Sequence, residues 1–228
     1  MVEAGGGRGE EDGVTRLCEA ASALDGFVHA AAIFVSDVGS GEGGLHGAVV
    51  HADKQDVADA AGFDDGGELG EVLVFADAAR DRGVDVALDV NFRSLLWDGE
   101  QARAVLEPIA RGASILFCSR TDAGIVFGVP GQGVDVCRNL REEIGAPTVV
   151  STDGRAGTYL STASEGERVY EIKSVPVIDR PGAGDSFVAG TLHGWLDGDV
   201  SRGIEIGTKV ASLALTHHGD LTHVRPAE

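Results

Sequence analysis

The chain has 228 residues, 43% of them apolar, which is enough to bury the core of an α/β domain and argues against disorder. Its formal net charge is −19, and only three of its 18 basic residues are lysines, so nucleic acid and anionic membranes are poor partners. This acidic, lysine-poor composition favours a halophilic protein, whose self-repulsion high salt screens, over one that is merely soluble.

No apolar run approaches the length that spans a bilayer, and residues 1–12 lack the basic start and apolar centre of a secretory signal. A cytoplasmic protein is therefore expected. The three cysteines have no CxxC spacing, which predicts reduced and mostly buried thiols at Cys18, Cys118 and Cys137. The seven histidines form no HExxH pattern, so metal binding by histidine is not expected.

The chain changes character near residue 68. Residues 1–67 are rich in glycine and poorly periodic, and we expect only two strands there, at 30–35 and 46–50. From residue 68 onward, apolar periodicity and glycine stops predict an alternation of helices and short strands. In chain order these elements are a helix at 68–82 that ends at Gly83, a strand at 84–90, a helix at 101–110, a strand at 114–118, helices at 121–127 and 134–144, a strand at 147–151, a hairpin of 157–161 with 168–173, a strand at 175–178, and helices at 184–196 and 201–217.

Short apolar strands that alternate with helices predict an α/β fold whose sheet is mainly parallel and covered on both faces. In such sheets the ligand lies beyond the carboxyl ends of the strands. Four loops follow predicted strands, after Val90, Cys118, Ser151 and Ile178. We therefore expect these four loops at one edge of the sheet, where they would form a common site.

The loop after Val90 carries two polar side chains, Asn91 and Arg93, which point the same way if the backbone is extended. The guanidinium fork of Arg93 suits a carboxylate or a phosphate. An equally weighted alternative is that Arg93 pairs with Asp89 and that Trp97 is ordinary core.

The next two loops have plain structural interpretations. Ser119, with Asp122 three residues later, indicates first of all the N-cap of a helix. The loop at 152–157 has glycines at Gly154 and Gly157, which either admit a nucleotide phosphate or simply form a turn.

The fourth loop is the most specific, because its glycines stand directly before an apolar-periodic helix. The N–H groups in the first turn of such a helix point at an anion, and Gly182 and Gly184 let the backbone approach it. Asp185 beside them can accept a proton from a hydroxyl that attacks phosphorus. The alternative is a tight connection in which Asp185 only stabilises the helix N-terminus, by roughly 0.3–1 kcal/mol.

Four segments together resemble the ribokinase-like (PfkB) carbohydrate kinases. Residues 179–187 resemble the family signature D-T-x-G-A-G-D-x-F, with Arg180 in place of the usual threonine. Residues 88–97 are similar to the D-x-N-Y-R-x-x-L-W segment of 2-keto-3-deoxygluconate kinases and some fructokinases. Residues 119–122 hold the place of the N-x-x-E element, and residues 152–157 match the K/T-x-G-x-x-G nucleotide loop. The tail at 219–226 resembles haloarchaeal members.

This resemblance implies a ribokinase-like three-layer α/β/α fold, with the ATP site in a core of residues 68–228. The family's N-terminal glycine pair and β-lid are not found in the poorly matched residues 1–67, so a truncated chain is expected. A homo-oligomer is left open, because the lid often pairs subunits in this family.

The resemblance further implies an ATP-dependent kinase that phosphorylates the primary hydroxyl of a sugar or sugar acid, with 2-keto-3-deoxygluconate first. The alternatives are a fructokinase, another sugar kinase of the family, or a non-catalytic nucleotide-binding remnant. Mg²⁺ would neutralise the ATP phosphates, and Asp122 would lie near it.

The roles of the other site residues follow from the same resemblance. Asp185 would be the base, and the N–H groups of Gly182, Ala183 and Gly184 would hold the transferring phosphoryl group. Asn91 and Arg93, with Asp185, would contact the sugar acid. Residues from three loops would line the ATP site, namely Ser119, Thr152, Asp153, Gly154, Gly157, Gly182 and Gly184.

Overall fold

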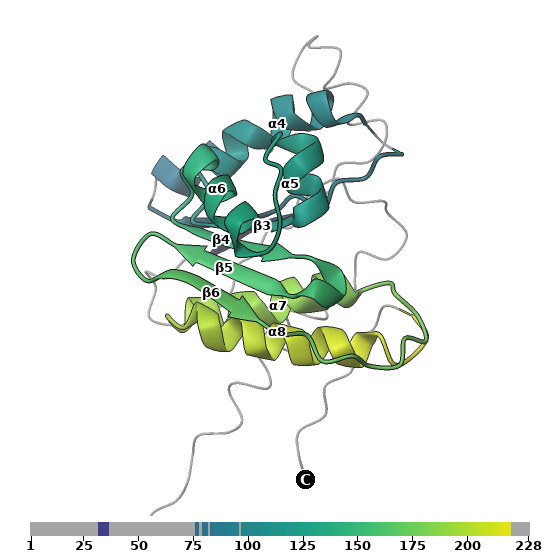
Figure 1. Ribbon diagram of the computed structural model, residues 1–228. Coiled ribbons are helices and arrows are strands. Elements are labelled where there is room, and N and C mark those ends of the chain that lie inside the picture. The colour runs from purple at the N-terminus through teal and green to yellow at the C-terminus, as the bar shows by residue number, and fades with distance from the viewer. Residues whose placement is uncertain (1–31, 37–75, 78, 82, 96, 220–228) are drawn as a thin grey trace, which may run out of the picture. The chain divides into compact units, whose positions relative to one another are not determined.

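The computed structural model describes residues 32–36, 76–77, 79–81, 83–95 and 97–219 (Figure 1). They fall into two compact units, and each is described by itself. We call the described residues up to Ile172 the sheet unit and those from Lys173 onward the helical unit. The strand expected at 46–50 and the residue Cys18 lie outside the described residues, and the domain boundary at residue 68 stays a prediction.

The sheet unit holds a six-stranded sheet whose strands follow one another in chain order. The strands are β1 (Ala32–Ser36), β2 (Asp85–Asp89), β3 (Ile115–Ser119), β4 (Thr148–Thr152), β5 (Thr158–Thr162) and β6 (Gly166–Tyr170). β2, β3 and β4 pair in parallel, whereas β1 is antiparallel to β2, and β5 and β6 extend the sheet as an antiparallel hairpin. The strands β2, β3 and β4 at the centre of the sheet are therefore parallel to one another, and β6 runs in the same direction as these three.

Three helices connect the parallel strands, and Figure 1 shows them on one side of the sheet. They are α4 (Gly99–Arg111), α5 (Arg120–Val126) and α6 (Val134–Ile144). Each has apolar residues at helical spacing, and these bury against alternate residues of the strands. The core so formed includes Leu106, Ile109, Leu140, Leu88, Leu116 and Val149. The intervening strand residues Ile115, Phe117 and Val150 are buried as well, as expected for parallel strands with two covered faces.

Local signals set the helix ends. Asp98 and Gln101 form a capping box at the start of α4. Gly145 ends α6 in the left-handed conformation, with φ of 83°, which a glycine adopts without a Cβ penalty. The helix expected at 68–82 is confirmed for its described residues, and it ends at Gly83.

The parallel register brings three of the expected loops to one edge of the sheet. Cα partners include Asp89 with Phe117 and Ser119 with Thr152, so β2, β3 and β4 end side by side. The loops that follow Val90, Cys118 and Ser151 therefore leave the sheet at the same edge, which confirms that prediction for these three.

The helical unit consists of α7 (Ala183–Leu196) and α8 (Val200–Ala214), two adjacent helices in close contact. Glycines face each other where the helices meet. A Cβ placed on Gly190 would lie 2.6 Å from the Cα of Gly207, and Gly194 approaches Gly203 in the same way. The two backbones are thus closer than any side chain at these positions would allow.

The strand expected at 175–178 is wrong, because residues 171–178 form no strand. Pro176 has no N–H to contribute to a ladder. The N–H of Ile178 instead donates to the carbonyl of Leu215, at 2.8 Å, just after α8. The segment before the glycine turn is therefore tied to the end of a helix within its own unit.

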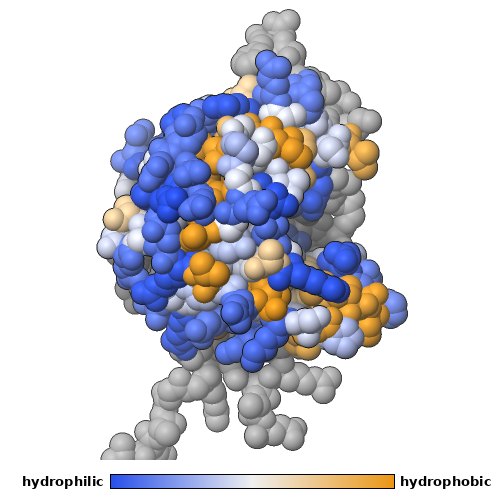
Figure 2. Space-filling view, viewed as in Figure 1, coloured by the Kyte–Doolittle hydropathy of each residue, from blue (hydrophilic) through white to orange (hydrophobic). Residues whose placement is uncertain are grey.

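The remaining described features agree with the composition. Cys118 and Cys137 are buried and unpaired, and burial raises the pKa of Cys137 to about 12, so both are inert thiols as expected. No helix in the described part of the chain is long and apolar enough to cross a membrane. Polar residues dominate the described surface in the view of Figure 2.

Candidate functional site

The loop after β2 turns sharply at its second residue. Asn91 has φ of 39°, a left-handed conformation that asparagine tolerates better than most residues. Asn91 therefore lacks the extended backbone on which the expected common direction of Asn91 and Arg93 depended. Arg93 is exposed, and Trp97 is only 4% exposed within the core, which confirms the structural interpretation of that tryptophan. The pairing of Arg93 with Asp89 stays a prediction.

The loop after β3 is organised by Ser119 and Asp122. The Ser119 side chain accepts a hydrogen bond from the backbone N–H of Asp122, at 3.0 Å, which confirms Ser119 as the N-cap of α5. Burial raises the pKa of Asp122, while hydrogen bonds from the Ser119 side chain and the Phe92 backbone, and the nearby Arg93 cation, oppose that rise. Asp122 thus connects its own loop with the loop after β2.

The loop after β4 is a compact turn. Gly154 begins a single 3₁₀ turn, η1 (Gly154–Ala156), with φ of 54°. The N–H of Asp153 donates to the carbonyl of Gly157 at 3.0 Å, and the N–H of Ala156 donates to the carbonyl of Asp153 at 2.9 Å. Gly157 has φ of 146°, outside the range that side chains favour. The loop therefore closes on itself through its backbone, as the turn interpretation predicted.

One ion pair links this loop to its neighbour. The Arg120 Nε lies 2.8 Å from the Asp153 Oδ1, and both side chains are partly exposed. The sequence did not indicate this pair, because it depends on the register that sets Ser119 beside Thr152. The structure thus joins all three strand-end loops of the sheet unit, the first two through Asp122 and the last two through Arg120.

The glycine turn of the helical unit has the conformation that the sequence predicted. Gly182 is the N-cap of α7 with φ of 72°, and no side chain caps the first turn of the helix. Asp185 lies in that turn, and a Cβ added at Gly184 would meet nothing within 4 Å. Backbone N–H groups near an open helix N-terminus suit an anion.

Asp179, at the start of this turn, is fixed by the backbone. Its carboxylate accepts hydrogen bonds from the N–H groups of Arg180, at 2.9 Å, and Gly219, at 3.3 Å. These bonds, the Arg180 bond above all, lower the pKa of Asp179. Asp179 therefore joins the turn before α7 to the segment that follows α8.

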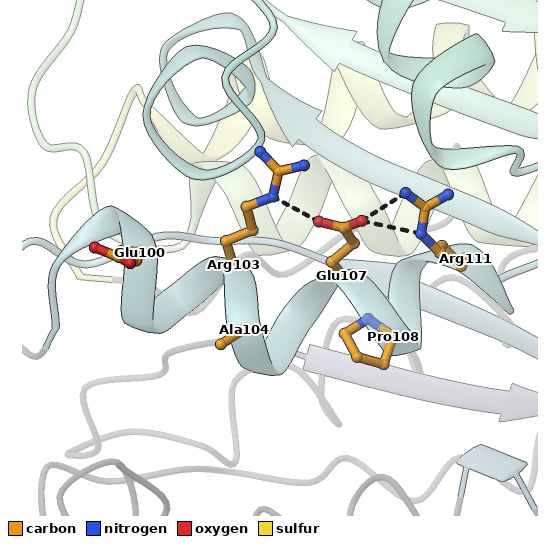
Figure 3. A pocket seen from close by; sticks show the side chains of 6 residues that line it. All are labelled: Glu100, Arg103, Ala104, Glu107, Pro108 and Arg111. Atoms are coloured by element: carbon orange, nitrogen blue, oxygen red, sulfur yellow. Dashed lines mark hydrogen bonds and ion pairs between the residues drawn. The ribbon is translucent and has the colours of Figure 1, made fainter.

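A cavity of about 490 Å³ lies elsewhere, along the outer side of α4 (Figure 3). Three of the four charged side chains that line it are engaged with one another. Glu107 accepts hydrogen bonds from Arg103, at 2.6 Å, and from Arg111, at 2.5 Å, and both arginines also donate to backbone carbonyls. This network serves the fold, and we assign it no ligand.

The hydrogen bonds of Glu107 make the free energy of unfolding depend on pH. Hydrogen bonds from Arg111 and Arg103 lower its pKa below the ordinary value of 4.5. A carboxylate whose pKa is lower in the folded chain than in the unfolded chain stabilises the fold at pH values above the unfolded-state pKa. This stabilisation is lost as the pH falls through the folded-state pKa. We expect Glu107→Gln to lower the free energy of unfolding at pH 7 by about 0.5–1 kcal/mol. Urea unfolding of both proteins checks this, and the difference should shrink as the pH falls below 4.5 and through the lowered folded-state pKa of Glu107. A constant difference across pH would contradict it.

Solved structures show that these elements form a ribokinase-like α/β protein. Aminoimidazole riboside kinase from Salmonella enterica is similar with a TM-score of 0.60 and 27% identity, over 72% of this chain and 56% of that one. The 2-dehydro-3-deoxygluconokinase of Thermotoga maritima is similar with a TM-score of 0.54 and 26% identity, over 64% of this chain and 49% of that one.

The sequence gives the more specific assignment. Residues 61–226 match the pfkB family carbohydrate kinase, so the chain belongs to that family. A curated relative, the 2-dehydro-3-deoxygalactonokinase of Haloferax volcanii, is 32% identical over 162 residues, which are 70% of this chain and 49% of that protein. The chain spans about half the length of the curated relatives it matches.

Proposed function

We propose that the chain carries the phosphoryl-transfer part of an ATP-dependent sugar kinase. The observation that carries this proposal is the glycine turn, in which a helix N-terminus without a side-chain cap has the carboxylate of Asp185 in its first turn. The N–H groups of Gly182, Ala183 and Gly184 hold the transferring γ-phosphoryl group, and Asp185 takes the proton from the attacking hydroxyl. Family membership supports these roles.

Within the sheet unit, the ATP site is formed by the residues that follow β3 and β4. Ser119 and the 152–157 loop surround the nucleotide, with Thr152, the backbone of Asp153, Gly154 and Gly157 as the contacts. A relative of similar fold was solved with aminoimidazole riboside and an ATP analog, which supports a shared use of nucleotide and sugar.

Mg²⁺ fits this site in a limited way. Asp122 offers a carboxylate, but Ser119 and the Phe92 backbone already donate to it and the Arg93 cation is nearby. No group of three or more metal-binding side chains occurs among the described residues. Mg²⁺ commonly keeps several waters and takes ligands from nucleotide phosphates, so a single carboxylate such as Asp122 suffices to hold it. The ion would supply charge neutralisation to the phosphates.

The acceptor in this proposal is the primary hydroxyl of a 2-keto-3-deoxy sugar acid, with 2-keto-3-deoxygluconate first. Arg93 is exposed at the edge of the sheet and supplies a fork of donors for a carboxylate, with Asn91 beside it. Two relatives bear the names of kinases for such sugar acids, one specific for the galactonate and one for the gluconate. A fructokinase remains the alternative within the family.

The test is ADP release with Mg²⁺-ATP and each of four acceptors: 2-keto-3-deoxygluconate, 2-keto-3-deoxygalactonate, fructose and ribose. Assays at low and at multimolar KCl also test the halophilic character that the composition suggests. We expect turnover with a sugar acid and a higher rate in salt. Turnover only with fructose would replace the substrate assignment, and ATP binding without turnover of any acceptor would overturn the kinase proposal.

A further inference from the structure

The ion pair between Arg120 and Asp153 lies where the parallel register places it. Ser119 and Thr152 are the last paired residues of β3 and β4, and Arg120 and Asp153 follow them directly. The Nε–Oδ1 distance is 2.8 Å. The pair therefore spans the start of α5 and the start of the 152–157 loop.

The pair is a poor source of stability. Side-chain exposure is 39% for Arg120 and 22% for Asp153, and ion pairs this accessible contribute little to folding. The 152–157 loop already closes through two backbone hydrogen bonds. The fold therefore does not depend on the pair, which leaves the neighbouring site as a reason for it.

The charge of Asp153 supplies that reason. A carboxylate in a loop that surrounds a polyphosphate repels it, and this repulsion is strong where water is partly excluded. The guanidinium of Arg120 cancels the charge and also fixes the side chain that begins η1. Without Arg120, the loop would present an uncompensated negative charge to the nucleotide.

We propose that Arg120 is a positioning residue for ATP, which acts through Asp153 by neutralising its carboxylate and holding the nucleotide loop. This inference rests on the proposed kinase function. It makes Arg120 a determinant of nucleotide affinity and leaves the chemical step to other residues.

The experiment measures steady-state kinetics and calorimetric binding of Mg²⁺-ATP in four variants. Arg120→Ala is expected to raise the KM for ATP about tenfold with kcat nearly unchanged, the effect of one uncompensated charge near a polyphosphate. Arg120→Lys keeps the charge, so its KM stays within about threefold of the unmodified chain. Arg120→Ala combined with Asp153→Asn regains most of the lost affinity, because the unpaired carboxylate is gone.

The matched control is Arg168→Ala. Arg168 of β6 pairs with Glu165 at 2.9 Å, a more exposed pair (51% and 57%), and Glu165 lies in the turn between β5 and β6 at the opposite edge of the sheet. We expect no change in its KM for ATP. The penalty of Arg120→Ala should also shrink in high salt, which screens the exposed charge.

The outcomes separate the two proposals. If the unmodified chain binds no ATP, both the kinase proposal and this inference fail. If it binds ATP and Arg120→Ala binds equally well, only the inference fails. Loss of affinity in both Arg120→Ala and Arg120→Lys, without rescue by Asp153→Asn, would show a merely structural role and overturn the inference as well.

Discussion

Replacement of Asp185 by Asn is expected to lower sugar-dependent ADP release about 10²–10⁴-fold, the usual contribution of a general base. Asn keeps the size of the side chain but cannot take a proton from the attacking hydroxyl. The open N-terminus of α7 is untouched, so ATP binding should persist. The fold should persist too, because asparagine has nearly the same size and shape as aspartate.

The matched control is Asp197→Asn, in which the exposed carboxylate at the other end of α7 is neutralised in the same way. It should leave the rate unchanged. Calorimetry with Mg²⁺-ATP and circular dichroism would show whether Asp185→Asn still binds and folds. A near-normal rate in that variant would remove Asp185 from the role of base.

The sequence predicts the described elements well wherever their signals are local. The helix at 134–144 matches α6 at both ends, because its apolar spacing and the left-handed Gly145 are encoded within a few residues. The N-cap at Ser119 and the glycine turn at Gly182 were predicted for the same reason. Each of these features needs no partner from a distant part of the chain.

The features that were missed depend on partners far away in the sequence. The apolar alternation at 175–178 indicated a strand, but a strand needs a neighbour to bond with, and Ile178 bonds to the end of α8 instead. Asn91 has a left-handed backbone conformation, which most asparagines do not adopt, and no sequence pattern indicates it. The Arg120–Asp153 pair follows from the alignment of β3 with β4, which only the folded sheet defines.

The sequence also did not indicate that glycines of α7 and α8 would face each other where the two helices meet. Substitution of one of these glycines is expected to have a large effect on stability. Gly190→Ala is expected to lower the free energy of unfolding by roughly 1–3 kcal/mol. The added Cβ would lie 2.6 Å from both the backbone N and the Cα of Gly207, and backbone atoms in a helix cannot yield as a flexible side chain does. The two helices would have to separate, which also disturbs the close approach of Gly207 in α8 to Phe187 and Thr191 in α7.

The same substitution at Gly184, in the first turn of the same helix, provides the control for stability. A Cβ there meets nothing within 4 Å, so Gly184→Ala should change the free energy of unfolding by no more than about 0.5 kcal/mol. Alanine is the better helix former by about 1 kcal/mol at an interior position, so a loss at Gly190 cannot come from propensity. Urea unfolding followed by circular dichroism gives the midpoint urea concentration of each variant. These midpoints can be compared as long as the dependence of the free energy on urea concentration is the same for all variants. Equal midpoints for Gly190→Ala and the unmodified chain would show that α7 and α8 do not meet as closely as described. A loss confined to Gly190 would mean that the glycine at this position is required by the close contact of α7 with α8.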